Sequence, residues 1–282
     1  MVKFKKDPRK YQGYIWFLLI FLFTLLVFLV VTRWVLEGEF QFIVRPREGS
    51  EAYFVSVPLN KIAQIIFLGP VFGIVYLVLM KLIINKIEKN NRKVVISVWI
   101  MEISILVLVS INSMGHALHL LVEEVNMIDA SKGYVLGETY NGVSLDVMSL
   151  LAWYLDEWFG HISIHVTYFG YLVVAVVAEY MASKHEKIMG DEAFLVIFGA
   201  IGIAVINGYA AIEGESGLIL LLLSATFSVI SIIVIGIKKI KILNYPIFLA
   251  LILSVIPVLL FNIVFIMENG VSPWFPYWGA NL

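Results

Sequence analysis

The sequence contains no cysteine in its 282 residues. This absence excludes disulfide bonds, thiolate nucleophiles, iron–sulfur clusters and zinc sites built on cysteine. The chain also lacks the P-loop, the dinucleotide-binding glycine fingerprint, the nucleophile elbow of serine hydrolases and the HExxH pair of zinc proteases. Any metal site must therefore use histidine, aspartate or glutamate side chains.

Charged residues are scarce as well, at 15% of the chain, whereas 61% of the residues are hydrophobic. The mean hydropathy is +0.93. Soluble domains carry about 25% charged residues, so this composition indicates an integral membrane protein. No basic domain is present, and nucleic acid is therefore not expected as a partner. The expected surroundings are membrane lipids.

Seven apolar runs are long enough to cross a bilayer, which requires roughly 20 helical residues. Their approximate limits are Tyr14–Leu36, Lys61–Asn85, Val94–His119, Gly160–Ser183, Ala193–Ile212, Leu218–Ile237 and Tyr245–Met267. The sequence therefore predicts an all-α, polytopic membrane helix bundle with about seven transmembrane helices, in a single domain that covers residues 1–282.

The segments between the runs alternate in charge. The short basic ones are KFKKDPRK at the amino end, KIEKNNRK, KHEK and KKIK. By the positive-inside rule they lie in the cytoplasm, so we expect a cytoplasmic amino terminus and a carboxyl terminus outside the cell membrane. The long outer segments, residues 37–60 and 123–158, are candidate docking surfaces for other membrane proteins.

Two polar faces interrupt the apolar pattern near the outer ends of the third and fourth runs. Residues three, four, seven or eight apart share one face of an α-helix. The two stripes are Asn112, His116, His119 and Glu123 on the third run, and Glu157, His161 and His165 on the fourth. The second stripe requires the helix to continue through Gly160. Each helix end then offers two imidazoles and one carboxylate on a single side.

The two stripes are predicted to meet. His116 and His161 lie equally far along the chain from the cytoplasmic ends of their spans, at Val94 and Ser183, so they are expected at one depth. Consecutive antiparallel helices are usually neighbours, so the two faces can oppose each other at the outer edge of the bilayer.

Imidazole and carboxylate together suit a transition metal ion, with zinc or iron expected, and argue against magnesium or calcium. The predicted ligands are His116, His119, His161, His165, Glu123 and Glu157. Six ligands exceed the four of a tetrahedral zinc site, so they suit one ion with spare carboxylates or two ions.

This pattern favours an outward-facing, metal-dependent membrane enzyme that hydrolyses or oxidises a lipid or another amphipathic substrate. Glu123 and Glu157 are the predicted ligands or general bases. Asp156, which lies off the stripe, is the predicted supporting acid or base. A sharp bend at Gly160 would exchange the positions of Asp156 and Glu157.

Other functions agree with the same residues. A metal or ion transporter, or a metal-delivery subunit, would need polar groups across the membrane, and Glu102, Glu179 and Asn207 form a sparse series of this kind. Two further alternatives are a subunit of a membrane complex in which the histidines bind haem for electron transfer with a quinone, and a purely structural subunit.

Ionisable side chains inside the spans are costly and are normally paired. Glu102 is therefore expected to form an ion pair with Lys81, near the inner end of the second run. Glu179 is expected close enough to the membrane surface for its side chain to reach water.

Overall fold

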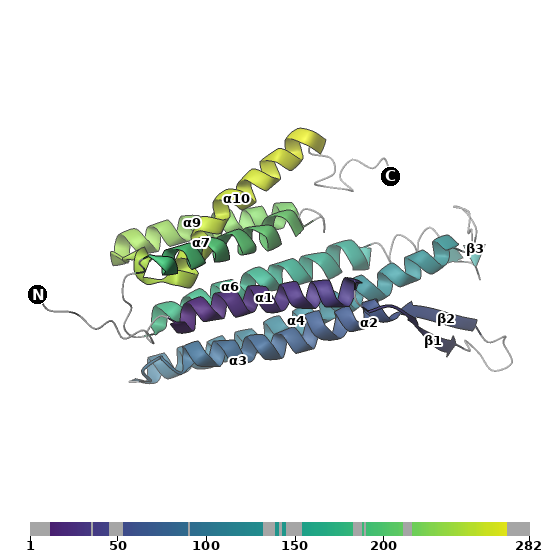
Figure 1. Cartoon of the computed structure of the whole chain (residues 1–282), viewed down its shortest axis with the longest axis horizontal. Helices are drawn as coiled ribbons and strands as arrows, with labels where there is room; N and C mark the ends of the chain where they lie inside the picture. The colour runs from purple at the N-terminus through teal and green to yellow at the C-terminus, as the bar shows by residue number, and fades with distance from the viewer. Residues whose placement is uncertain are drawn as a thin grey trace, which may run out of the picture. The chain divides into compact units, whose positions relative to one another are not determined.

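The structure is a computed structural model of the chain (Figure 1). It describes residues 12–34, 36–44, 53–89, 91–131, 139–140, 143–144, 154–182, 188, 190–210 and 216–269. The chain forms two compact units: unit 1 contains Met1–Phe23, Ile74–Val109 and His165–Leu282, and unit 2 contains Thr24–Gly73 and Ser110–Ile164. The single domain expected from the sequence stays a prediction.

Helices account for most of the described chain. They are α1 (Gln12–Trp34), α2 (Leu59–Ile66), the π-helix η1 (Phe67–Val71), α3 (Phe72–Ile84), α4 (Arg92–Ser131), the π-helix η2 (Tyr154–His161), α6 (Ile162–Met181), α7 (Asp191–Ala204), the π-helix η3 (Val205–Ala210), α9 (Gly217–Lys238), the short 3-10 helix η4 (Ile242–Asn244) and α10 (Pro246–Asn269). Two small antiparallel hairpins pair β1 (Glu39–Val44) with β2 (Tyr53–Pro58) and β3 (Thr139–Tyr140) with β4 (Val143–Ser144).

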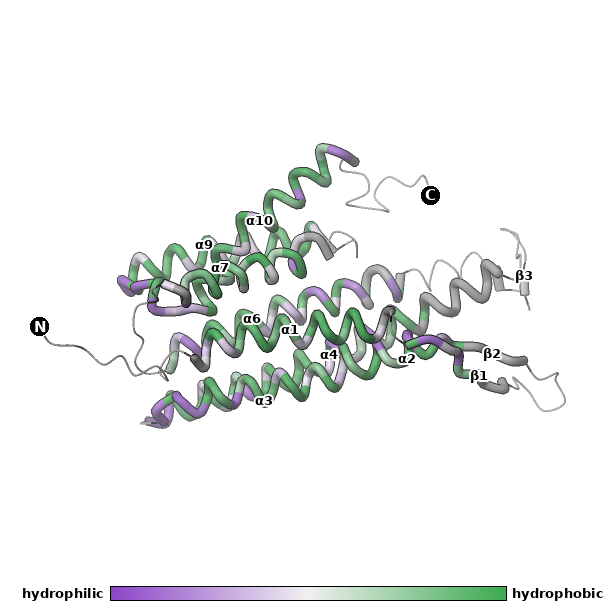
Figure 2. Tube along the Cα trace, in the orientation of Figure 1, coloured by the Kyte–Doolittle hydropathy of each residue, from purple (hydrophilic) through white to green (hydrophobic). Residues whose placement is uncertain are grey.

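Within the described residues, six helical stretches are long and apolar enough to cross a membrane. They are Gly13–Thr32, Leu59–Ile84, Arg92–Leu120, Phe159–Met181, Gly217–Lys238 and Pro246–Glu268. Hydrophobic residues predominate along these helices in Figure 2, so the predicted helical membrane protein is confirmed. The fifth predicted run contains a shorter apolar helix, Glu192–Gly208. A seventh span and the orientation of the termini stay predictions.

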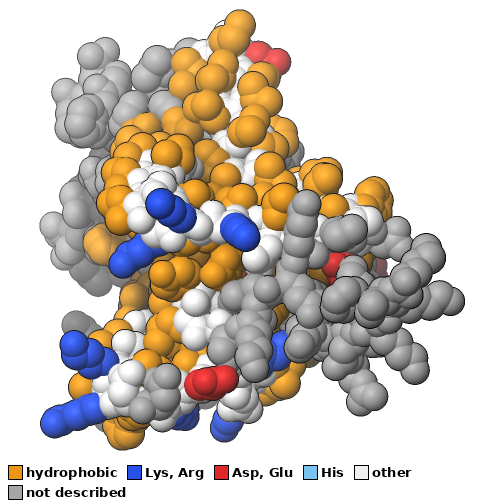
Figure 3. All heavy atoms as spheres, turned by 90° about the vertical axis from the view of Figure 1, so that its left-hand side faces the viewer, with side chains coloured by type: hydrophobic (Ala, Val, Ile, Leu, Met, Phe, Trp, Pro, Cys, Tyr) orange, Lys and Arg blue, Asp and Glu red, His pale blue; other side chains and the backbone are white. Residues whose placement is uncertain are grey.

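Basic side chains gather at one end of unit 1 (Figure 3). Exposed residues of this kind begin α4 and end α9: Arg92, Lys93, Lys238 and Lys239. These residues belong to the segments that the positive-inside rule assigns to the cytoplasm. The rule therefore predicts that the start of α4 and the end of α9 lie on the same side of the membrane.

Aromatic side chains fill the contact between α1, α3 and α6 in unit 1. Tyr76 is fully buried, and its hydroxyl donates a hydrogen bond of 2.6 Å to the backbone carbonyl of Tyr171. The ring centroids of Phe17 and Phe21 lie 6.0 Å and 6.1 Å from that of Tyr76. Because lipid tails are as apolar as these rings, close packing and hydrogen bonds stabilise the contact more than burial from water does.

A buried acid caps the first turn of α10. Both carboxylate oxygens of Glu179 accept hydrogen bonds from backbone N–H groups, at 3.0 Å from Ile247 and 2.9 Å from Phe248. The first N–H groups of a helix have no partner within it, and they lie at the positive end of the helix dipole. Glu179 has 0% exposed surface, so the expectation that it reaches water was wrong.

Replacement of Glu179 by alanine is expected to lower the free energy of unfolding by about 2–4 kcal/mol, because two buried N–H groups lose their acceptor. Glu179→Gln keeps one acceptor oxygen and should cost less. Thermal unfolding in detergent measures both changes. Val177→Ala, at a half-exposed position of α6, is the control. If Glu179→Ala unfolds like this control, the cap does not stabilise α10.

Candidate metal centre

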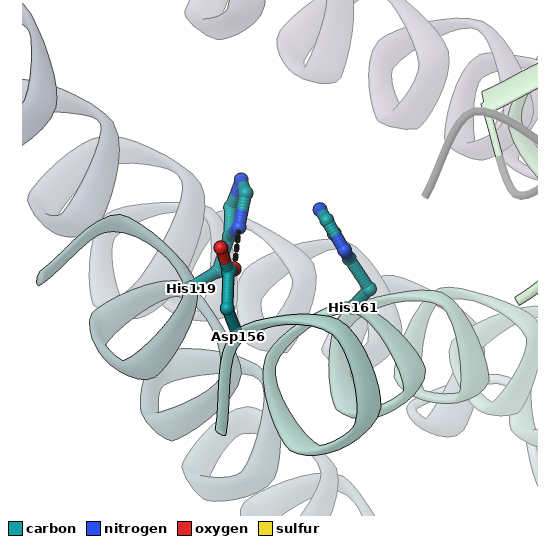
Figure 4. A group of neighbouring side chains, drawn as sticks. All are labelled: His119, Asp156 and His161. Atoms are coloured by element: carbon teal, nitrogen blue, oxygen red, sulfur yellow. Dashed lines mark hydrogen bonds and ion pairs between the residues drawn. The ribbon is translucent and has the colours of Figure 1, made fainter. Parts of the chain in front are cut away.

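Three side chains in unit 2 converge within reach of one ion: His119 from α4, and Asp156 and His161 from η2 (Figure 4). Each offers a ligand atom, and these atoms all lie within 4.8 Å of one another. The Nδ1 atom of His119 lies 2.5 Å from Oδ1 of Asp156, and the ring centroids of His119 and His161 are 4.1 Å apart. The group can therefore hold a metal ion.

The winding of η2 explains why Asp156 and His161 share a face. In a π-helix each N–H group bonds to the carbonyl group five residues earlier, and Asp156 and His161 are five residues apart. The sequence interpretation assumed α-helical winding, which would align His161 with Glu157. The altered winding puts Asp156 beside the two histidines instead.

Two glycines allow α4 and the η2–α6 helix to approach closely. A Cβ atom built on Gly160 would lie 2.9 Å from Cβ and 3.0 Å from Cα of His119. A Cβ atom on Gly115 would lie 2.9 Å from Cβ of Ser163 and 3.1 Å from the carbonyl oxygen of Gly160. Small residues commonly permit such contacts between membrane helices. Without them, His119 would be held farther from its two neighbours.

Asn112 joins α4 to the π-helix η1 in unit 2. Its side-chain amide is fully buried and donates a hydrogen bond of 2.8 Å to the carbonyl of Leu68 in η1. Leu68 lies in the π-helix η1, within the span Leu59–Ile84, so this bond joins two membrane-spanning helices. Asn112 is therefore an anchor that positions the helix bearing His119.

The bond between His119 and Asp156 defines how the histidine can bind a metal. A carboxylate that accepts the N–H group of one ring nitrogen fixes the orientation of the ring and leaves the other nitrogen for the metal. If Nδ1–H of His119 donates to Asp156, Nε2 is the ligand atom. In Figure 4 the outer ring nitrogens of His119 and His161 point to the same side. If Asp156 itself binds the ion, Nδ1 of His119 is the adjacent ligand.

The other predicted site residues lie on the same helices. His116 and His165 are buried, at 5% and 7% exposure, and are not members of the group of three. The side chains of Glu123 and Glu157 lie outside the described residues. The roles assigned to these four residues stay predictions.

The register of α4 against the η2–α6 helix differs from the predicted one by about one helical turn. The sequence predicted that His116 and His161 lie at the same depth, whereas the ring that packs against His161 belongs to His119. Helix boundaries inferred from sequence are uncertain by about two to four residues, which accounts for this difference. The position of Asp156, which was predicted to lie off the stripe, differs for another reason, because a π-helical turn has no simple sequence pattern. The indication in the sequence was Gly160, where a bend was expected to exchange the positions of Asp156 and Glu157.

Substitution of Gly160 by alanine is expected to push η2 away from α4, because the added Cβ has no space beside His119. We expect a loss of about 1–3 kcal/mol in the free energy of unfolding, together with weaker zinc binding. Gly236→Ala is the matched control, since a Cβ there meets no atom within 4 Å. Thermal unfolding and zinc titration compare the two variants. Equal stability and equal zinc affinity of the two variants would show that Gly160 is not needed for the close approach of η2 to α4.

Comparison with protein-family models, with curated proteins and with solved structures finds no match for this chain.

Proposed function

We propose that this chain is a membrane metalloenzyme that binds one transition metal ion, zinc or iron, through His119, Asp156 and His161. The observation that carries the proposal is the convergence of one ligand atom from each of these side chains within 4.8 Å. The ligands come from two helices that are in tight contact at Gly160. Such a contact holds the donors in place without the metal.

The donor set supports these two metals. Two imidazoles and one carboxylate bind catalytic zinc in several hydrolases and form the facial triad of non-haem iron oxygenases. Three protein ligands leave further coordination positions for water or substrate, whereas structural zinc sites are closed by four. The set therefore favours catalysis, by hydrolysis with zinc or by oxidation with iron.

The position of His119 along α4 supports a site at the outer surface. Exposed Arg92 and Lys93 begin this helix, and His119 follows roughly 40 Å farther along its axis, at 1.5 Å per residue. The positive-inside rule assigns the basic end to the cytoplasm. A site at the opposite end of the span Arg92–Leu120 is accessible from outside or laterally from the outer leaflet, so the proposed substrate is a lipid or another amphipathic molecule.

Glu123 is the proposed general base. It follows His119 by four residues on α4, so the two residues share a helix face. A carboxylate close to a catalytic metal can accept a proton from the attacking water. This role leaves Asp156, rather than Glu123, as the carboxylate of the three-residue centre.

Elemental analysis of the protein purified in detergent is expected to find about one zinc or iron ion per chain. The double variant His119→Ala, His161→Ala should lose that ion, because a single carboxylate does not retain it. His185→Ala is the control, because this histidine belongs to neither of the two predicted stripes. Metal that is absent from the native protein, or retained in the double variant, would contradict the assignment.

Substitutions at Asp156 separate its two possible roles. If the carboxylate only orients His119, Asp156→Asn and Asp156→Ala should each weaken zinc binding by about 10–100-fold. If the carboxylate is itself a ligand, Asp156→Ala should abolish stoichiometric binding. Competition with a chelator of known affinity measures both variants. Unchanged affinity in both would remove Asp156 from the centre.

A further inference from the structure

Three exposed lysines lie where α9 ends and α10 begins. Lys238, Lys239 and Lys241 belong to the short connection between two membrane-spanning helices, α9 and α10. The term α9–α10 turn denotes residues 238–245, all of which belong to unit 1. Among the residues that the structure describes, none of the three ammonium groups has an ion-pair or hydrogen-bond partner. The turn therefore presents three positive charges that no described residue neutralises.

The α9–α10 turn lies at a membrane surface. One span ends at Lys238 and the next begins at Pro246, so the residues between them are outside the hydrocarbon core. The rings of Tyr180 and Tyr245 lie beside each other at this end, with their centroids 6.2 Å apart, and Tyr180 is 46% exposed. Tyrosine is enriched where the membrane meets water, at the depth of the lipid headgroups. The lysines of the turn are therefore at the depth of lipid phosphate groups.

Backbone hydrogen bonds fix the α9–α10 turn at two points. The N–H group of Ile240 donates to the carbonyl of Ile235 in α9, at 3.1 Å. The carbonyl of Leu243 accepts a hydrogen bond of 2.8 Å from the N–H group of Ile188, which precedes α7. A turn that is already ordered loses less conformational entropy when it binds a ligand. The three lysines therefore extend from fixed backbone positions.

Lys239 adopts a backbone conformation that favours glycine. Its φ angle is +50°, in the left-handed region, at the end of α9. Glycine is the usual residue at such a helix end, because a Cβ atom makes the left-handed conformation less favourable. A residue in an unfavourable conformation points to a function that the favourable residue would not provide. Here the feature that glycine would lack is the positive charge.

The apolar neighbours of the lysines are exposed as well. Ile237 is 72% exposed, and Leu243 is 45% exposed. Such side chains can contact acyl chains, while the stem of a lysine lies along apolar surface and its ammonium group reaches the headgroups. Phospholipids carry a phosphate group next to their acyl chains, so they match both kinds of side chain. A small soluble anion would use the charges alone.

We propose that the α9–α10 turn binds anionic phospholipids of the cytoplasmic leaflet, with Lys238, Lys239 and Lys241 at the headgroup. The positive-inside rule assigns this turn to the cytoplasmic side. Anionic lipids attract basic segments next to membrane helices, by a factor of roughly five in affinity for each lysine. Zwitterionic phosphatidylcholine has no net charge and gains little from these lysines. The proposal does not depend on the metal centre, which lies in unit 2.

Fluorescence energy transfer from the protein to labelled lipids tests the proposal. Because the chain has no cysteine, Asn244→Cys gives a single site for a donor dye in the turn. The full chain is placed in phosphatidylcholine vesicles with a low, equal fraction of phosphatidylglycerol or phosphatidylcholine that carries the acceptor dye on an acyl chain. Transfer to phosphatidylglycerol should be higher by about fivefold or more. A donor at Met267→Cys, near the other end of α10, is the control and should show no such preference.

Substitutions of the lysines identify the source of the preference. Lys239→Gly should lower it by about twofold or more, although glycine suits the left-handed conformation and the variant should unfold at the same temperature or higher. Replacement of all three lysines by glutamine should remove the preference. The double variant Arg92→Gln, Lys93→Gln, at the start of α4, is the control for charge elsewhere in unit 1 and should retain it.

Three results would each overturn the proposal. The first is equal transfer to both lipids in the native protein, and the second is a preference that survives the loss of all three lysines. The third is an equal loss in the control at the start of α4, which would show that the summed charge of unit 1, not the turn, attracts the lipid. If the triple variant does not fold, Lys239→Gly takes its place, and an unchanged preference in that variant would overturn the proposal as well.

Discussion

The contact between Gly160 and His119 is the constraint on which the proposed metal centre depends. The backbone of η2 at Gly160 lies against the Cα and Cβ atoms of His119 in α4. The distance from His119 to Asp156 therefore follows from helix packing. A buried carboxylate such as that of Asp156 is costly to bring out of water without a partner. Here the hydrogen bond between Asp156 and His119, at 2.5 Å, offsets part of that cost. A bound cation would offset more of it, because it removes the remaining unpaired charge of the carboxylate.

The three π-helical turns share a physical feature: each brings a polar group into an otherwise apolar helix. In η1 the carbonyl of Leu68 accepts a hydrogen bond from the side-chain amide of Asn112. The π-helix η2 supplies Asp156 and His161. In η3, Asn207 is buried at 1% exposure. A π-turn shifts the helical register by one residue, which aims a side chain where an α-helix would not. The site and its anchor in unit 2 therefore both depend on interrupted α-helical winding.

The sequence predicts the long apolar helices well because their length and composition are set by the bilayer, not by contacts with other helices. The residue types at the site are also predictable, since histidine is rare in this chain and its positions repeat at helical spacing. The identity of the central carboxylate is not predictable in the same way. It depends on one extra residue in the π-helical turn η2 and on the close contact at Gly160, which is a tertiary feature. The cap that Glu179 forms on α10 depends on a tertiary contact for the same reason. The ion pair expected between Lys81 and Glu102 is not formed among the described residues.

The surroundings of the intramembrane polar residues favour a local site over a transport path. A path needs side chains with free ligand atoms that face a common interior. Both oxygens of Glu179 are engaged by the first turn of α10, so this carboxylate has a structural role. Glu102 is exposed on the outside of α4, where it cannot line an interior route. Asn207 alone does not form a series of sites. The only group of described residues with the donors and spacing for a metal ion is that of His119, Asp156 and His161, near the end of the span Arg92–Leu120.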